Sequence, residues 1–264
     1  MSLVGTERCN NGDSQMMGIF LPKGSSAKVK LIEGEKDLKI TFFTNTRSQN
    51  SFASVKAGKD DYTTLQNFNN NINYDGVPLI TTPRLNESGL IDKTYKIEVV
   101  FDSTVKELNY YHYKDSEELF GTKWSASGNS FGVVVGEAMM VVVPYFDKDK
   151  ISNYNDNGSF KFPIGSIDDF LEYTLEVVNR MDKMIGLEFD AKNALDQNFR
   201  TKCLIVADAG YGSGAYYMGT FIGISSASVS AAFQYGWGTL HEIAHGYQGT
   251  LGKGGEQQMK PLLK

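Results

Sequence analysis

The sequence predicts an α+β fold in which a strand-rich first part precedes a mixed second part. Up to about residue 146, short runs of β-forming residues recur between clusters of Gly, Asn, Ser and Pro, which is typical of a β-sandwich. From Asp147 onward, helical periodicity alternates with short apolar runs. We therefore expect a β-sandwich-like domain over residues 12–146 and a second domain over residues 147–264.

The first part contains five predicted strand regions, at residues 16–22, 27–33, 38–44, 93–101 and 131–144. In the fourth of these, Tyr95, Ile97 and Val99 alternate with polar residues, which predicts a half-buried strand with these three side chains on one face. The polar stretch DKDKISNYNDNGS, residues 147–159, is typical of a linker or a long loop.

The second part begins with a predicted amphipathic helix. Ser166 is a candidate N-cap with Asp169 three residues later. Apolar residues recur at three- and four-residue steps up to Ile185, and the helix is expected to end at Gly186. The run CLIVAD, residues 203–208, predicts a buried strand in which Cys203 is a small hydrophobic side chain. The only other cysteine is Cys9, so the sequence does not resemble a disulfide-stapled scaffold.

Composition and charge exclude several functional classes. The chain has 264 residues, a net charge of −5 and no Lys/Arg cluster, which argues against a nucleic-acid partner. No apolar run approaches the roughly 18 residues that a transmembrane helix needs, so no membrane-spanning segment is expected. The first residues lack the basic-then-apolar pattern of a secretory signal.

The stretch WGTLHEIAHGYQG, residues 237–249, carries the clearest chemical pattern. His241 and His245 are two of only three histidines in the chain, and their spacing places both on one face of a helix. Two imidazoles so placed can reach one ion, and Glu242 can take a proton from water beside it. Zinc is the expected ion, because imidazole and carboxylate groups are typical zinc ligands.

A third protein ligand is needed, and the carboxylate that follows the motif is Glu256, after ten intervening residues. Glu256 could equally be an exposed side chain near a frayed terminus. His112, beside three tyrosines, is interpreted as a sheet or surface residue rather than a ligand.

The glycine-rich stretch ADAGYGSGAYYMG, residues 207–219, lacks the patterns of a phosphate-binding loop. An ordinary loop is the default interpretation. The alternative is a strand edge along the cleft that pairs with an extended peptide. Gly214, Ala215 and Tyr216 would then bind substrate near the metal.

Three stretches give the chain a resemblance to a known family: residues 18–31, residues 76–99 and residues 236–249, GWGTLHEIAHGYQG. They resemble the enhancin-like metallopeptidases, the M60-like group that includes viral enhancins and bacterial mucin-degrading proteases. The likeness runs from about residue 16 to residue 250, and only the HExxH core is sharply specific.

The resemblance implies a β-sandwich-like part followed by a zincin-type catalytic part, and a secreted or cell-surface location. It implies His241 and His245 as zinc ligands, Glu242 as general base, and a glutamate ligand after a variable gap that Glu256 satisfies. The family's catalytic domain continues well past this glutamate, whereas eight residues follow Glu256. The chain is therefore expected to be truncated at its C-terminus.

The expected function is zinc-dependent hydrolysis of peptide bonds in glycoproteins such as mucins. The alternative is a glycan- or mucin-binding module with an incomplete, inactive metal site, whose aromatic run NYYHY, residues 109–113, provides the binding surface. A zinc hydrolase that acts on a non-peptide bond is a weaker third hypothesis.

Overall fold

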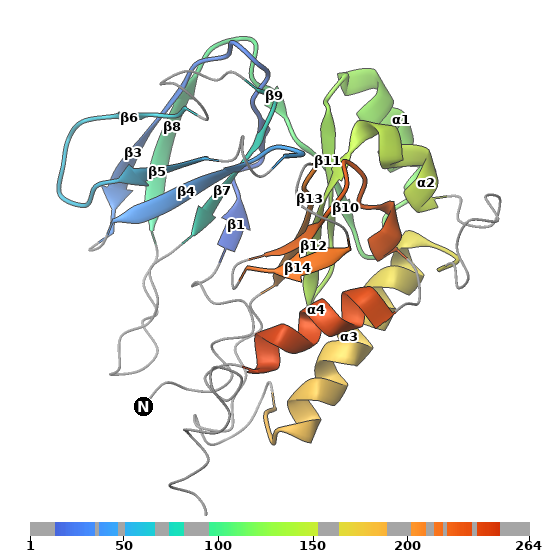
Figure 1. Ribbon diagram of the computed structural model, residues 1–264. Coiled ribbons are helices and arrows are strands. Elements are labelled where there is room, and N and C mark those ends of the chain that lie inside the picture. Colours follow the sequence, from blue (N-terminus) through green and yellow to red (C-terminus); the bar gives the residue numbers. More distant parts are fainter. Residues whose placement is uncertain are drawn as a thin grey trace, which may run out of the picture.

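The fold mixes α and β structure in three layers (Figure 1). The computed structural model describes residues 14–34, 37–46, 51–66, 74–81, 95–152, 164–188, 202–209, 214–218, 221–233 and 237–248. A six-stranded sheet lies between small antiparallel sheets from the first part of the chain and a layer of helices. None of the helices in these ranges has the length and apolar character needed to cross a bilayer.

The first part of the chain forms two small antiparallel sheets and a strand pair. The four-stranded sheet has the order β1 (Ser14–Met16), β7 (Val77–Thr81), β4 (Leu38–Phe43), β5 (Ser51–Val55). The three-stranded sheet has the order β6 (Thr63–Thr64), β3 (Ala27–Glu33), β8 (Lys96–Phe101), and β2 (Ile19–Phe20) pairs with β9 (Lys106–Glu107). Alternate residues of β3 and β4 enclose one apolar core, and Tyr95, Ile97 and Val99 pack against it as their spacing predicts.

The six-stranded sheet is mixed in direction and buried on both faces. Its order is β10 (Asn109–His112), β11 (Phe131–Val135), β12 (Met139–Pro144), β13 (Cys203–Ala207), β15 (Ile222–Ile224), β14 (Ala215–Tyr217). Side chains alternate between the faces: Met140 and Val142 of β12 pack toward the first part of the chain, and Val141 toward the helices. Because both faces of β12 are buried, its sequence is a continuous apolar run rather than an alternation of apolar and polar residues.

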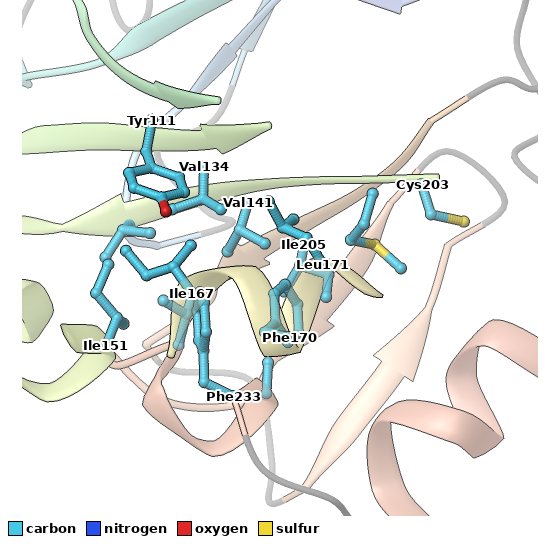
Figure 2. Close-up of a cluster of buried hydrophobic side chains, with 14 of the residues drawn as sticks. Tyr111, Val134, Val141, Ile151, Ile167, Phe170, Leu171, Cys203, Ile205 and Phe233 are labelled. Carbon is cyan, nitrogen blue, oxygen red and sulfur yellow. The ribbon is translucent and has the colours of Figure 1, made fainter. Parts of the chain in front are cut away.

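The helices cover the other face of this sheet. They are α1 (Glu117–Ser127), α2 (Lys148–Ser152), α3 (Ile167–Met184) and α4 (Trp237–Gln248), with short 3₁₀ turns η3 (Tyr145–Asp147) and η5 (Ser230–Ala232). Figure 2 shows Ile167, Phe170 and Leu171 of α3 packed toward the sheet strands. The predicted cap of α3 is present, because Ser166 Oγ accepts a hydrogen bond from the Asp169 N–H at 3.0 Å.

The six-stranded sheet joins the two sides of the expected division between residues 146 and 147. Strand β12 precedes this point and β13 follows it, yet the two strands pair in parallel, with Met139 opposite Cys203. The sheets themselves change between β9 and β10. We therefore propose that the division between structural units lies near residue 108.

Two local expectations are wrong. Cys203 is buried as expected, but it is disulfide-bonded rather than a simple hydrophobic side chain. The linker or long loop expected over residues 147–159 is instead helical in residues 147–152, which belong to η3 and α2, and residues 153–159 lie outside the described residues. Asp147 is fully buried. The Asp147 carboxylate accepts hydrogen bonds from Ser228 Oγ and the Val229 N–H, both at 2.7 Å. It also forms an ion pair with Lys150. These bonds join two segments that are far apart in the sequence.

We predict that Asp147→Ala lowers the free energy of unfolding by about 3 kcal/mol, because it leaves the buried Val229 N–H without an acceptor and removes the hydrogen bond from Ser228 Oγ. The matched control is Asp149→Ala, which removes an exposed ion pair with Lys148 and is expected to cost less than about 1 kcal/mol. Urea denaturation measures both. Equal losses in the two variants would contradict the structural role of Asp147.

Candidate metal centre

Helix α4 is held against the core by its apolar face. Ile243 is fully buried in the core on the helical side of the sheet, and Tyr247 packs against the same core. The Tyr247 hydroxyl donates to Asp182 Oδ1 at 2.7 Å and lies 3.3 Å from the Val178 carbonyl oxygen, which ties α4 to α3. In Figure 1, α4 crosses α3 below β14. The opposite face of α4 therefore carries the histidines.

The two histidines of α4 converge as the helical spacing predicts. His241 Nε2 and His245 Nε2 lie 3.0 Å apart, and both rings are half-buried. Two nitrogens at about 2.0–2.1 Å from one tetrahedral ion would lie roughly 3.3 Å apart. The side chains of His241, Glu242 and His245 form a potential metal-binding group whose ligand atoms lie within 4.8 Å of one another.

Glu242 is buried beside the histidines. The residue is 5% exposed, and its Oε2 lies 3.9 Å from His245 Nε2. No hydrogen-bond donor among the described residues reaches this oxygen. A buried carboxylate oxygen without a donor is unfavourable unless a cation or an ordered proton donor lies close to it. A cation between the two imidazoles would supply that compensation.

Strand β14 forms the edge of the sheet beside α4. The Ser225 N–H donates to the Gly214 carbonyl, and the Met218 N–H donates to the Phe221 carbonyl. In this antiparallel register, the backbone groups of Ala215 point away from β15, toward the open edge of the sheet. Gly214 adopts a φ of 96°, a conformation that side chains disfavour.

The side chains of β14 alternate between the two faces of the sheet. The Tyr217 ring stacks near His245, with ring centroids 6.4 Å apart. Tyr216 points the other way: its hydroxyl donates to the buried Asp208, and its ring covers Gly223 and leaves no room for a Cβ there. The predicted peptide-binding edge is thus beside the histidines, and Tyr217 rather than Tyr216 contacts a histidine.

Several solved structures share this arrangement of sheets and helices. The catalytic module of the metalloprotease ZmpA from Clostridium perfringens matches with a TM-score of 0.65 and 17% identity, over 93% of this chain and 51% of that one. The M60 catalytic domain of Clostridium perfringens ZmpC, in complex with the sialyl T antigen, matches with a TM-score of 0.65 and 14% identity, over 92% and 50%. A functionally unknown conserved protein from Bacillus anthracis matches with a TM-score of 0.65 and 14% identity, over 93% and 48%.

The chain has an M60-like fold. It spans about half the length of each of these structures. No family model matches the sequence, and no curated protein matches it. The resemblance expected from three short stretches is therefore confirmed by the fold.

The residues of this M60-like chain fit a divalent metal ion. Two imidazole nitrogens face one point, and an unpartnered carboxylate oxygen lies beside them. Borderline-soft ions such as zinc favour this donor set. Glu256, the expected third ligand, lies outside the described residues. His112 lies in β10 and is exposed, as expected for a sheet or surface residue.

Two aromatic residues beside the histidines received no role from the sequence. Trp237 is 74% exposed and stacks on His241, with ring centroids 4.2 Å apart, and Tyr217 lies near His245. The position of Trp237 four residues before His241 could have revealed this contact, because such residues are neighbours on a helix. Tyr217 lies in β14 and His245 in α4, so no local sequence pattern connects the two residues.

The aromatic run at residues 109–113 is not one exposed binding surface, as the alternative function requires. Tyr111 is buried, donates to Asp168 Oδ1 at 2.9 Å, and burial raises its pKa. Tyr110 is partly buried in the core on the other face of the sheet, and burial raises its pKa to about 12. Only Tyr113 among the three tyrosines is well exposed, at 42%.

We predict that Tyr247→Phe lowers the free energy of unfolding by about 2 kcal/mol, because it removes a donor from the buried Asp182 carboxylate. Zinc affinity should fall as well, since the helix that carries both histidines loses its hydrogen bond to α3. Tyr113→Phe is the matched control, because it removes an exposed hydroxyl contact with Glu172. Denaturation and zinc titration test both variants, and a change in Tyr113→Phe as large as in Tyr247→Phe would refute the anchoring role.

Proposed function

We propose that this chain carries the metal centre of a zinc-dependent endopeptidase that hydrolyses peptide bonds in glycoproteins such as mucins. The observation that supports this most strongly is the convergence of His241 Nε2 and His245 Nε2 beside the buried Glu242, within an M60-like fold. Both histidine ligands and the general base come from one helix, so the core that fixes α4 also fixes the relative positions of these three side chains.

His241 and His245 would hold the ion, and we propose Glu256 as the third ligand. Zinc held by such a set would act as a Lewis acid and would lower the pKa of water enough for it to lose a proton near neutral pH. The Glu242 carboxylate would take the proton from the attacking water and deliver it to the leaving amine. Its burial suits this role, because a carboxylate shielded from bulk solvent exchanges its proton with the reacting groups beside it.

The edge strand β14 supplies a place for the substrate backbone. An extended peptide could pair with the outward backbone groups of Ala215, as strands are added to open sheet edges in many complexes. Gly214 has no side chain to obstruct the start of this edge. We propose Gly214, Ala215 and Tyr216 as the substrate-binding segment, with the Tyr217 ring between this strand and His245.

Two observations support a glycoprotein substrate outside the cytoplasm. One structural neighbour was solved in complex with the sialyl T antigen, a glycan. The disulfide bond of Cys203 suits an oxidising compartment, because cytosolic proteins rarely keep disulfides. We therefore propose a secreted or cell-surface location. The N-terminal sheets, which enclose a core of their own, would form a β-sandwich-like unit.

Cleavage of mucin by Glu242→Gln tests this function. The variant keeps the size of the side chain but removes the proton acceptor, so the cleavage rate should fall by about 10²–10⁴-fold while bound zinc remains. Glu176→Gln, an exposed position on α3 that pairs with Arg180, is the control and should cleave at the wild-type rate. Gel electrophoresis of a purified mucin and elemental analysis provide the two readouts. An intact mucin after incubation with the zinc-loaded wild-type chain, or full activity of Glu242→Gln, would contradict the proposal.

A further inference from the structure

A cavity lies at the junction between the N-terminal sheets and the six-stranded sheet. Its volume is about 740 Å³, within the range of roughly 300–1,000 Å³ that is usual for small-molecule sites. Its wall comes from the turn at Lys23, the ends of β4 and α1, the residues before β7 and β11, and η3. None of the residues that line it belongs to α4 or β14. We refer to it as the junction cavity.

One side of the junction cavity is aromatic and open to solvent. Tyr145 and Phe146 of η3 line it and are 41% and 50% exposed. The Tyr145 ring meets the buried Trp124 edge to face, with centroids 5.6 Å apart, so a core residue fixes its orientation. Two adjacent exposed rings on a fixed turn present apolar faces to a ligand at little cost in side-chain entropy.

The other side of the junction cavity is polar and already ordered. The Asp75 carboxylate accepts hydrogen bonds from the Lys23 N–H at 2.8 Å and from the Ser130 hydroxyl, and thus links the two structural layers. Asn129 Nδ2 donates to the Glu107 carbonyl at 2.8 Å and to the Asn109 side chain at 2.9 Å. A site with polar groups held in place before binding requires little reorganisation when a ligand arrives.

Asn129 fixes the wall of the junction cavity from behind. The residue is 1% exposed, and its Oδ1 is buried and accepts no hydrogen bond from the described residues. Its Nδ2 makes two hydrogen bonds, which fix the orientation of the amide. The side-chain acceptor that a ligand in the cavity meets is therefore the half-buried Asp75 carboxylate.

The residues that line the junction cavity carry one charge of each sign. Lys23 is the only basic residue among those that line it, and Asp75 is the only acidic one. The Lys148 and Lys150 ammonium groups lie near the Tyr145 and Phe146 rings, 6.0 and 5.1 Å from the ring centroids. A ligand with apolar faces and a rim of hydroxyl groups matches both sides of the wall.

We propose that the junction cavity binds a carbohydrate, with a sugar ring stacked on the exposed Phe146 ring and its hydroxyl groups facing the Asp75 carboxylate. Sugar rings present polarised C–H groups that are attracted to the electron-rich face of an aromatic ring. This site goes beyond the proposed peptidase function, because it contains none of the residues of the metal centre. On a glycoprotein with many glycans, a second contact would raise the local concentration of substrate at α4.

Titration calorimetry with the free disaccharide of galactose and N-acetylgalactosamine tests this site. Phe146→Ala should weaken binding about tenfold, as expected for the loss of one stacked aromatic ring. Phe101→Ala is the matched control, since Phe101 is also 50% exposed but lies at the end of β8 outside the cavity wall. Tyr145→Ala is a weaker probe, because it also removes a contact with Trp124.

A further variant distinguishes this site from a glycan contact at the metal centre. Binding should persist in Trp237→Ala, whose side chain stacks on His241. Loss of binding in Trp237→Ala with unchanged binding in Phe146→Ala would place the sugar at α4 and overturn the inference, while leaving the proposed peptidase function intact. Failure of the wild-type chain to bind the disaccharide would also overturn it.

Discussion

Burial of the six-stranded sheet on both faces is the constraint on which the arrangement of the molecule depends. Strand β12 sends Val141 and Val143 toward the helices and Met140 and Val142 toward the N-terminal sheets, and all four side chains are at most 3% exposed. At about 25 cal/mol per Å² of apolar area removed from water, each such residue contributes roughly 1.5–3 kcal/mol. Two different layers are therefore fixed to one rigid element, and each layer contributes to a different candidate site.

The same constraint explains how the ionisable side chains of α4 are held beside an apolar core. Helix α4 buries Ile243 in the core, which leaves the face with His241 and His245 turned toward β14. Glu242, at the border between these faces, is buried without a donor for Oε2, an arrangement that disfavours an isolated charge. The sequence thus places an energetically unfavourable group beside two potential ligands. Such a local conflict with folding stability is typical of functional sites.

Local patterns in the sequence predict much of this structure. The strands at residues 27–33 and 38–43, the cap at Ser166 and the relation of His241 to His245 all depend on periods of two or about four residues. Helix α1 was missed because its buried side chains are only Phe120 and Trp124, too few to form a clear apolar stripe. Its cap at Ser116, which accepts from the Leu119 N–H, is a signal that could have revealed it.

Features that depend on contacts between distant segments could not be predicted in this way. The parallel pairing of β12 with β13 joins residues about 60 positions apart, so nothing in the polar stretch after β12 indicated that the sheet resumes at Cys203. The stacking of Tyr217 on His245 and the hydrogen bonds of Asp147 to Ser228 and Val229 also join segments that are distant in the sequence. Each arises from how the elements pack, and a single sequence without contact information does not specify this.

The zinc content of the purified chain and of two histidine variants tests the metal centre most directly. Elemental analysis after dialysis should find one zinc ion per wild-type chain and per His112→Ala chain, because His112 lies outside the metal-binding group. His241→Ala should lose the ion, since a single imidazole on α4 cannot replace a chelating pair. Equal zinc in His241→Ala and in the wild-type chain, or none in any of the three proteins, would contradict a metal centre on α4.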